Sequence, residues 1–165
     1  MRKKLTVVIA LLLLFSKIAY GTPPSALDIG KIIYHLEPGT NVEVAYDMLG
    51  PPDKKTGRFF TTPPALRWDL TPYGTIMIFL SDSFTIHTSL YSEIYDQMEP
   101  ALQRYKELEE VFHEILDAAG VAFKKFEHAT ACLIENSFFG LEYKKVSSFL
   151  GSKHKVSIYF VKRKE

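Results

Sequence analysis

The sequence predicts an α+β fold: short N-terminal helices packed on an antiparallel β-meander, followed by a longer helix and a second antiparallel meander. Helical apolar periodicity appears in three separate stretches, the longest of them between Pro100 and Gly120. Alternating, β-prone residues fill the stretches that follow the helices. Because this order of helix and meander occurs in both halves, we expect one continuous sheet with helices over one face and the opposite face partly available.

The first 21 residues have the features of a signal peptide. Basic residues at positions 2–4 precede an apolar run of eleven residues, Leu5–Phe15, and Ala19-Tyr20-Gly21 offers small residues at a cleavage site. The run is shorter than the roughly 18–20 residues that span a bilayer, and Lys17 follows it. An uncleaved membrane anchor is the alternative. Cleavage would give a periplasmic or secreted protein that begins at Thr22 and has no transmembrane segment.

Charge and cysteine content restrict the function classes. The chain has 20 Lys+Arg and 19 Asp+Glu, but four basic residues lie in the signal peptide, which leaves 16 against 19, a net charge of −3. This balance gives no support for nucleic-acid binding, which needs a concentrated basic surface. Cys132 is the single cysteine, so no intramolecular disulfide forms and stability must come from packing. Its apolar surroundings indicate a small buried side chain.

Two short helices are predicted at the start of the mature chain. The first covers residues 26–36, with Ser25 as its N-cap. The second begins with a capping box of Thr40 and Glu43 and ends at Gly50, which we expect in a left-handed conformation. The apolar positions are Leu27, Ile29, Ile32, Ile33 and Leu36 in the first helix, and Val42, Ala45, Tyr46 and Leu49 in the second.

The first meander follows these helices. Alternation around Trp68 predicts one strand, Thr75–Leu80 is strongly β-prone, and residues 81–83 form the tip of a hairpin. The returning strand is expected to place four residues on one face: Phe84, Ile86, Thr88 and Leu90. We therefore assign residues 22–90 to a first helix-helix-meander unit.

Residues 91–165 are predicted as a second unit that packs with the first. Pro100 suits the first turn of a helix that ends at Gly120. The apolar stripe of this helix contains Ala101, Leu102, Tyr105, Leu108, Phe112, Ile115, Leu116 and Ala119. The strands expected after it are Ala129–Glu135, Phe138–Val146 and Lys155–Lys162.

Residues of the first unit form a pattern that is also found in a known family: Leu36, Gly39, Thr40, Val44, Leu49, Gly50, Pro52 and Asp53, followed by Arg67–Leu70 and Thr75–Phe84. On these residues the unit resembles the SmpA/OmlA domain, the BamE-like module of bacterial envelopes, over roughly residues 28–90. In that family a tryptophan strand precedes a hairpin, and its members support outer-membrane assembly and integrity. This chain has Ser83 where the hairpin tip usually carries glycine, and it lacks the lipid-attachment cysteine of the outer-membrane lipoproteins.

An aromatic and proline-rich segment is the candidate partner-binding site. Aromatic and arginine side chains are enriched at interface hot spots, and prolines present them with little entropy left to lose. The alternative is that these aromatics, together with Trp68, fill the space between helix and sheet. The proposed partner-binding residues are Arg58, Phe59, Phe60, Pro63 and Pro64.

No residue pattern nominates a catalytic, cofactor or metal site. His113 and Asp117 have the i, i+4 spacing of a metal-binding pair on a helix, but no further ligand motif follows nearby. His128 and Cys132 would form a nucleophile pair only if their strand were strongly twisted, because four residues of extended chain separate them by about 13 Å. We therefore expect no enzyme activity and no cofactor.

The sequence thus favours an exported bacterial cell-envelope protein that acts as a non-catalytic interaction module, with another envelope protein as its partner and a role in outer-membrane assembly or integrity. The alternative is a secreted inhibitor of an extracellular or periplasmic enzyme. The β-lactamase inhibitory proteins, which this predicted architecture resembles, are built from similar tandem units of helix and meander. Both inferences rest on likeness of fold.

Overall fold

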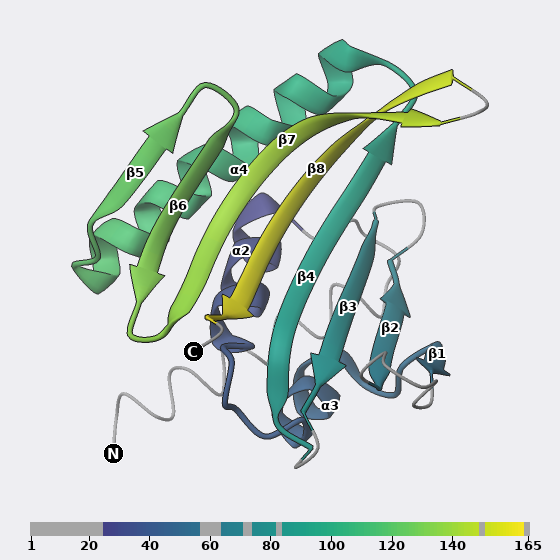
Figure 1. Ribbon diagram of the computed structural model, residues 1–165, viewed down its shortest axis with the longest axis vertical. Helices are drawn as coiled ribbons and strands as arrows, with labels where there is room; N and C mark the ends of the chain where they lie inside the picture. The colour runs from purple at the N-terminus through teal and green to yellow at the C-terminus, as the bar shows by residue number, and fades with distance from the viewer. Residues whose placement is uncertain (1–24, 57–63, 71–73, 82–83, 149–150, 164–165) are drawn as a thin grey trace.

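The computed structural model describes residues 25–56, 64–70, 74–81, 84–148 and 151–163 (Figure 1). The predicted α+β class is confirmed: the described residues form three helices and one antiparallel sheet of eight strands. The helices are α2 (Ala26–His35), α3 (Glu43–Leu49) and α4 (Met98–Ala119). The strands are β1 (Lys54–Thr56), β2 (Ala65–Asp69), β3 (Thr75–Leu80), β4 (Ile86–Tyr95), β5 (Phe123–Phe126), β6 (Ala129–Ile134), β7 (Ser137–Ser148) and β8 (Gly151–Lys162).

The sheet joins two meanders along one seam. Its spatial order is β1-β2-β3-β4-β8-β7-β6-β5, so the last strand of each meander pairs with the last strand of the other. This seam runs from the pair Thr88↔Val161 to the pair Tyr95↔His154. The expectation of a single continuous sheet is confirmed. The first expected unit ends at residue 90, which lies inside strand β4.

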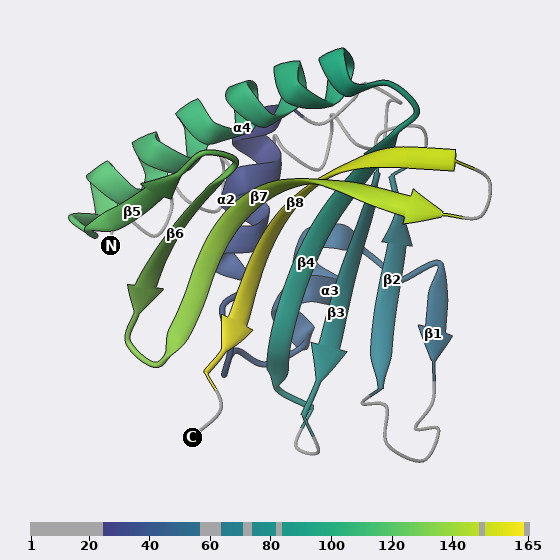
Figure 2. The ribbon, with the colours of Figure 1, turned by 45° about the horizontal axis from the view of Figure 1, so that its top comes forward.

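All three described helices cover the same face of the sheet (Figure 2). The core lies between these layers, and the aromatic rings of Phe112 on α4 and Phe139 on β7 stack at 4.6 Å. Trp68 is 3% exposed and donates its indole N–H to the Gly50 carbonyl at 3.0 Å. This inward position of Trp68 agrees with the alternation read from its strand. No helix in the described residues is long and apolar enough to cross a membrane.

The first helix follows its sequence signals closely. Ser25 accepts the Asp28 N–H and Asp28 accepts the Ser25 N–H, both at 3.1 Å, which completes a reciprocal cap. Four of the five predicted apolar positions are buried, namely Ile29, Ile32, Ile33 and Leu36. The fifth, Leu27, is 37% exposed.

The capping box predicted for α3 does not form. The helix begins at Glu43, whose N–H is accepted by the Asn41 side chain at 2.9 Å. The Thr40 carbonyl accepts the Ile86 N–H at 2.8 Å, so this segment is held against the start of β4. Gly50 has the expected positive φ, at 71°, but its ψ of −164° lies outside the left-handed helical region.

The buried face of α3 is also turned relative to the prediction. Val42 and Ala45 are buried as expected, but Met48 is buried and Leu49 is only partly buried. Val42, Ala45 and Met48 follow one another at intervals of three residues, so they share one side of this short helix, and that side faces the core.

The face predicted for the returning strand of the first hairpin was wrong. Phe84 has a φ of 57° and is 70% exposed, so it precedes the strand. The register then shifts at Phe79/Leu80, and one face of β4 buries Ser89, Tyr91 and Glu93, while Leu90 points to the other side. The strand also continues to Tyr95.

The second half contains one strand that the sequence pattern missed. The strand β5 (Phe123–Phe126) pairs with β6 over its whole length and forms an edge of the sheet. The helix α4 ends at Ala119, and Gly120 follows it in a left-handed conformation. Its buried positions are Ala101, Tyr105, Leu108, Phe112 and Leu116, whereas Ala119 is exposed.

A polar cluster ties β5 and β6 to α4. The Glu109 carboxylate accepts hydrogen bonds from Lys125 at 2.9 Å, Tyr105 at 3.0 Å and Thr130 at 3.2 Å. Burial acts to raise the pKa of Glu109, but the bonds from Lys125 and Tyr105 outweigh it and hold that pKa below its usual value. The ionised carboxylate therefore anchors this end of the sheet to the helix layer.

We expect Glu109→Gln to reduce the acid sensitivity of folding. A carboxyl group whose pKa is lowered in the folded state stabilises the fold above its unfolded pKa, about 4.3, and this contribution is lost as pH falls through the folded value. Urea unfolding between pH 7 and pH 2 should thus show a shallower stability loss for Glu109→Gln than for wild type. The control is Glu110→Gln, at an exposed position on the same helix; equal slopes for both variants would contradict the role of Glu109.

The position of Met48 gives a second stability prediction. Met48→Ala should lower the free energy of unfolding by about 2–5 kcal/mol, as core truncations do. Leu49→Ala should cost less because that side chain is only partly buried. Chemical denaturation of both variants compares their free energies of unfolding. A larger loss of stability for Leu49→Ala than for Met48→Ala would show that the face predicted from the sequence is the buried one.

Candidate functional site

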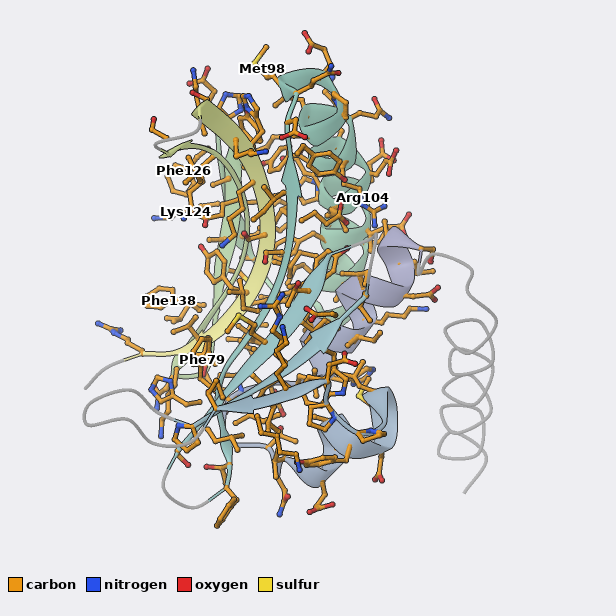
Figure 3. The ribbon with its side chains drawn as sticks, turned by 90° about the vertical axis from the view of Figure 1, so that its right-hand side faces the viewer. Phe79, Met98, Arg104, Lys124, Phe126 and Phe138 are labelled. Atoms are coloured by element: carbon orange, nitrogen blue, oxygen red, sulfur yellow. The ribbon has the colours of Figure 1, made fainter. Side chains whose placement is uncertain are left out.

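No described helix covers the second face of the sheet, which curves inward (Figure 3). We call this surface the concave face. Strand register fixes its members, because each residue shares its face with the residue paired across the ladder, as in Leu133↔Phe138 and Lys144↔Lys155. Lys124, Phe126 and Phe138 project from this side in Figure 3, and Arg104 lies on the helix side. Its apolar residues include Met77, Phe79, Leu90, Ile94, Phe126, Ala131, Leu133, Phe138, Val146, Tyr159 and Val161.

The concave face carries most of the exposed large hydrophobic side chains in the described residues. Eight such side chains are exposed, and five of them lie here: Ile94, Phe126, Leu133, Phe138 and Val146. Phe126 is 58% exposed and Leu133 48%. Antiparallel sheets with a free face normally alternate apolar and polar residues, and gathered exposed apolar side chains mark an interaction surface.

An apolar hollow of about 490 Å³ lies at the β5 end of this face. Ala131 contributes only a methyl group to the lining of the hollow, and the larger side chains of Leu133 and Phe138 form its sides. Phe126 and Lys124 line it from β5, the edge strand. The hollow has room for one large apolar side chain of a partner, and the Lys124 ammonium group offers a positive charge beside it. Its lining residues are Ala122, Phe123, Lys124, Phe126, Ala131, Cys132, Leu133 and Phe138.

The Tyr159 side chain packs over Gly140 on the concave face, next to this hollow. The two residues are paired across β7 and β8, and a Cβ atom at Gly140 would lie 2.5 Å from the Tyr159 ring. The ring therefore lies over the glycine, as cross-strand aromatic residues do at glycine positions in sheets. Burial, with a smaller effect of the Glu142 carboxylate, raises the pKa of Tyr159, so its hydroxyl stays neutral.

The charges of the protein are divided between its two sides. The strands place six cationic side chains on the concave face, against the carboxylates of Asp69 and Glu142. The exposed positions of α4, on the helix side, include Glu99, Glu107, Glu110, Glu114 and Asp117. The six cationic residues are Lys54, Arg67, Lys124, Lys144, Lys153 and Lys155.

Most of these cations already have a carboxylate partner. Asp69 lies 2.5 Å from Arg67, and the Lys144 ammonium lies 2.8 Å from Glu142. Lys124 and Lys155 have no ion pair among the described residues. Burial, and then repulsion by Lys144, lower the pKa of Lys155. The concave face thus combines apolar surface with uncompensated positive charge.

The site proposed from sequence falls almost entirely outside the described residues. Arg58, Phe59, Phe60 and Pro63 lie there, so their role in partner binding stays a prediction. Pro64 is described: it is partly buried directly before β2, and its carbonyl accepts the Leu80 N–H at 2.8 Å.

Sequence reasoning missed the residues of the hollow, although a signal was present. Ala131–Ile134 and the pair Phe138 and Phe139 place apolar side chains on both faces of their strands. A strand that is apolar on both sides predicts that both faces are covered. Here the helices cover only one of those faces.

The residues of the two candidate catalytic or metal-binding pairs make other contacts in the structure. The His113 ring stacks on Phe123 at 4.4 Å, and no group of three or more potential metal ligands occurs in the described residues. The His128 ring lies edge-on to Tyr143, whereas the buried Cys132 thiol donates to the Phe139 carbonyl at 3.6 Å. Burial raises the pKa of Cys132 to about 11, which keeps this thiol protonated near neutral pH.

Comparison with known proteins finds no family model, no curated protein and no solved structure that matches this chain. The resemblance to the SmpA/OmlA domain therefore stays a prediction from residues 28–90. Function has to be argued from the concave face itself.

The contact between Gly140 and Tyr159 yields a prediction about this face. Gly140→Ala should lower stability by about 1–3 kcal/mol, because the added methyl group displaces the Tyr159 ring. The loss in the Tyr159→Ala background should be smaller, since the clash is then absent. A double-mutant cycle by urea denaturation measures the difference, and additive losses would show that the ring does not lie over Gly140.

Proposed function

We propose that this protein is a non-catalytic interaction module of the bacterial cell envelope, and that its concave face binds another envelope protein. The observation that carries the proposal is the gathering of Phe126, Leu133 and Phe138 around a hollow on the face of the sheet that no described helix covers. Interfaces of protein complexes centre on such apolar pockets, surrounded by polar groups. The role does not call for a catalytic residue or a cofactor.

The location in the envelope is supported by the sequence alone. The basic, apolar and small-residue regions of positions 1–21 favour export, which would place the mature protein in the periplasm or outside the cell. The resemblance to the SmpA/OmlA domain favours a role in outer-membrane assembly or integrity, and this part of the proposal is an analogy.

A secreted inhibitor of an extracellular or periplasmic enzyme is the second candidate. The observation that favours it is the width of the concave face, which extends across both meanders without a helix or a described loop to interrupt it. A wide surface formed by paired strands is preorganised, so little entropy is lost when it covers a partner. The resemblance to tandem-unit inhibitors points the same way.

Affinity capture from envelope extract tests the proposal directly. The immobilised wild-type protein should retain a protein that the double variant Leu133→Asp/Phe138→Ser retains at least about tenfold less, because the hollow loses its apolar walls. The control is Phe84→Ser, which removes an aromatic ring that is more exposed than Phe138, at 70% against 43%, and that lies outside the strands. Retention by the double variant at the wild-type level, with both variants folded by circular dichroism, would contradict binding through the concave face.

Assays of the captured protein separate the two candidates. An enzyme whose activity falls in the presence of the purified wild-type protein, and not of the double variant, identifies an inhibitor. A captured outer-membrane assembly component without such an activity supports the envelope module.

A further inference from the structure

We propose that the β5 end of the concave face receives an extended, acidic segment of the partner protein, which pairs with β5 as a ninth strand and places an apolar side chain in the hollow. This inference rests on the proposed function and adds the chemistry and the conformation of the bound segment. Three features of the described residues lead to it: a free sheet edge, a hollow beside that edge, and positive charge without a partner.

The free edge is β5. It is the last strand in the sheet order and pairs with β6 through all four of its residues. No backbone hydrogen bond from another described element reaches its outer side. Alternate residues of an antiparallel edge strand direct their N–H and C=O groups outward, so β5 offers the donors and acceptors that an added strand requires.

The hollow lies within reach of a strand added at this edge. Lys124 and Phe126 belong to β5 itself and line the hollow from its outer side. A strand paired with β5 would run about 4.8 Å from it, and its side chains on the same face would point toward these two residues. One large apolar side chain from that strand can then enter the space above Ala131, between Phe126 and Leu133. Backbone pairing supplies affinity and the hollow supplies selectivity.

Charge decides what kind of segment fits. Lys124 has no ion pair among the described residues and stands at the hollow, whereas Lys125, on the opposite face, is bound to Glu109 at 2.9 Å. A carboxylate on the incoming strand would neutralise the charge of Lys124. The bound strand would partly exclude water from this ion pair, which would then stabilise the complex more than a pair on an open surface does. The excess of cations over the whole concave face attracts the same acidic partner at longer range.

The same charges argue against a second copy of this chain as the occupant. Antiparallel pairing of two β5 strands would bring the consecutive lysines Lys124 and Lys125 of each copy close together. Like charges across a strand pair are destabilising, and lysines at a sheet edge are a common device against self-association. An acidic segment meets no such repulsion.

Two synthetic peptides with blocked ends test the proposal on the purified mature protein. The acidic probe is Thr-Glu-Thr-Phe-Thr-Glu-Thr, whose two Glu side chains share one face of the strand with Phe, and the matched probe replaces each Glu with Lys. We expect the acidic probe to bind at least about tenfold more tightly in an NMR titration. It should also slow hydrogen exchange of the backbone amides of residues 123–126, which edge pairing protects.

Variants assign the binding to this end of the face. Lys124→Glu should weaken binding of the acidic probe about tenfold or more and favour the basic probe, and Leu133→Asp should weaken the acidic probe to a similar extent. Ile94→Asp is the matched control, since this residue is exposed on the same face but belongs to β4; it should change the affinity less than about twofold. Lys124→Ala, a change at an exposed position, serves if the charge reversal fails to fold.

Equal affinity for the two probes, unchanged amide exchange in β5, or Ile94→Asp acting as strongly as Leu133→Asp would each overturn the inference. A dimer that Leu133→Asp abolishes would also overturn it, in favour of a second copy. If an envelope protein is captured through the concave face but these probe results are negative, the inference fails and the proposed function stands. If the probes behave as expected but no envelope protein is captured, the proposed function fails instead.

Discussion

The pairing of β4 with β8 is the interaction on which the rest of the structure depends. It joins residues that are 73 positions apart at Thr88↔Val161 and 59 apart at Tyr95↔His154, and makes two four-stranded meanders into one sheet. Without this seam each meander would expose an additional edge strand. The core would also be split in two, because Tyr91 on β4 and Ile158 on β8 are paired across the seam and are both fully buried. The concave face exists only because the seam makes the sheet eight strands wide.

A buried ion pair holds the helix layer across this seam. The Arg104 guanidinium on α4 lies 2.8 Å from the Glu93 carboxylate on β4, with side-chain exposures of 18% and 8%. Glu93 also accepts the hydroxyl groups of Tyr91 and Tyr95. Because loss of Arg104 would leave the Glu93 carboxylate buried without a cationic partner, this contact sets where α4 lies on the sheet more than it adds net stability.

The helices cover one face of the sheet, and this asymmetry explains the functional surface. Strands β6 and β7 carry apolar side chains on both faces, as Phe138 and Phe139 show. Phe139 is fully buried under the helices, whereas Phe138 is exposed on the concave face. Since these strands have the composition of a sheet covered on both sides, the uncovered side is suited to a partner. Paired strands hold that surface rigidly, in contrast to binding sites on loops.

The sequence by itself determined the features that depend on near neighbours in the chain. The cap of Ser25 and Asp28, the left-handed Gly120 and the buried stripe of α4 follow from contacts within one or two helical turns, and the α+β class follows from their order. Tertiary structure decided the rest. Thr40 is held by a backbone bond to Ile86 and not by a helix cap, and the register shift before β4 changed which of its residues face inward, because both depend on a strand elsewhere in the chain. Alternation in β6 and β7 marked two apolar faces without distinguishing them. Only the packing of α2 and α4 on one side decided that Leu133 and Phe138 would remain exposed, since the choice of face is a property of the assembled layers and not of either strand.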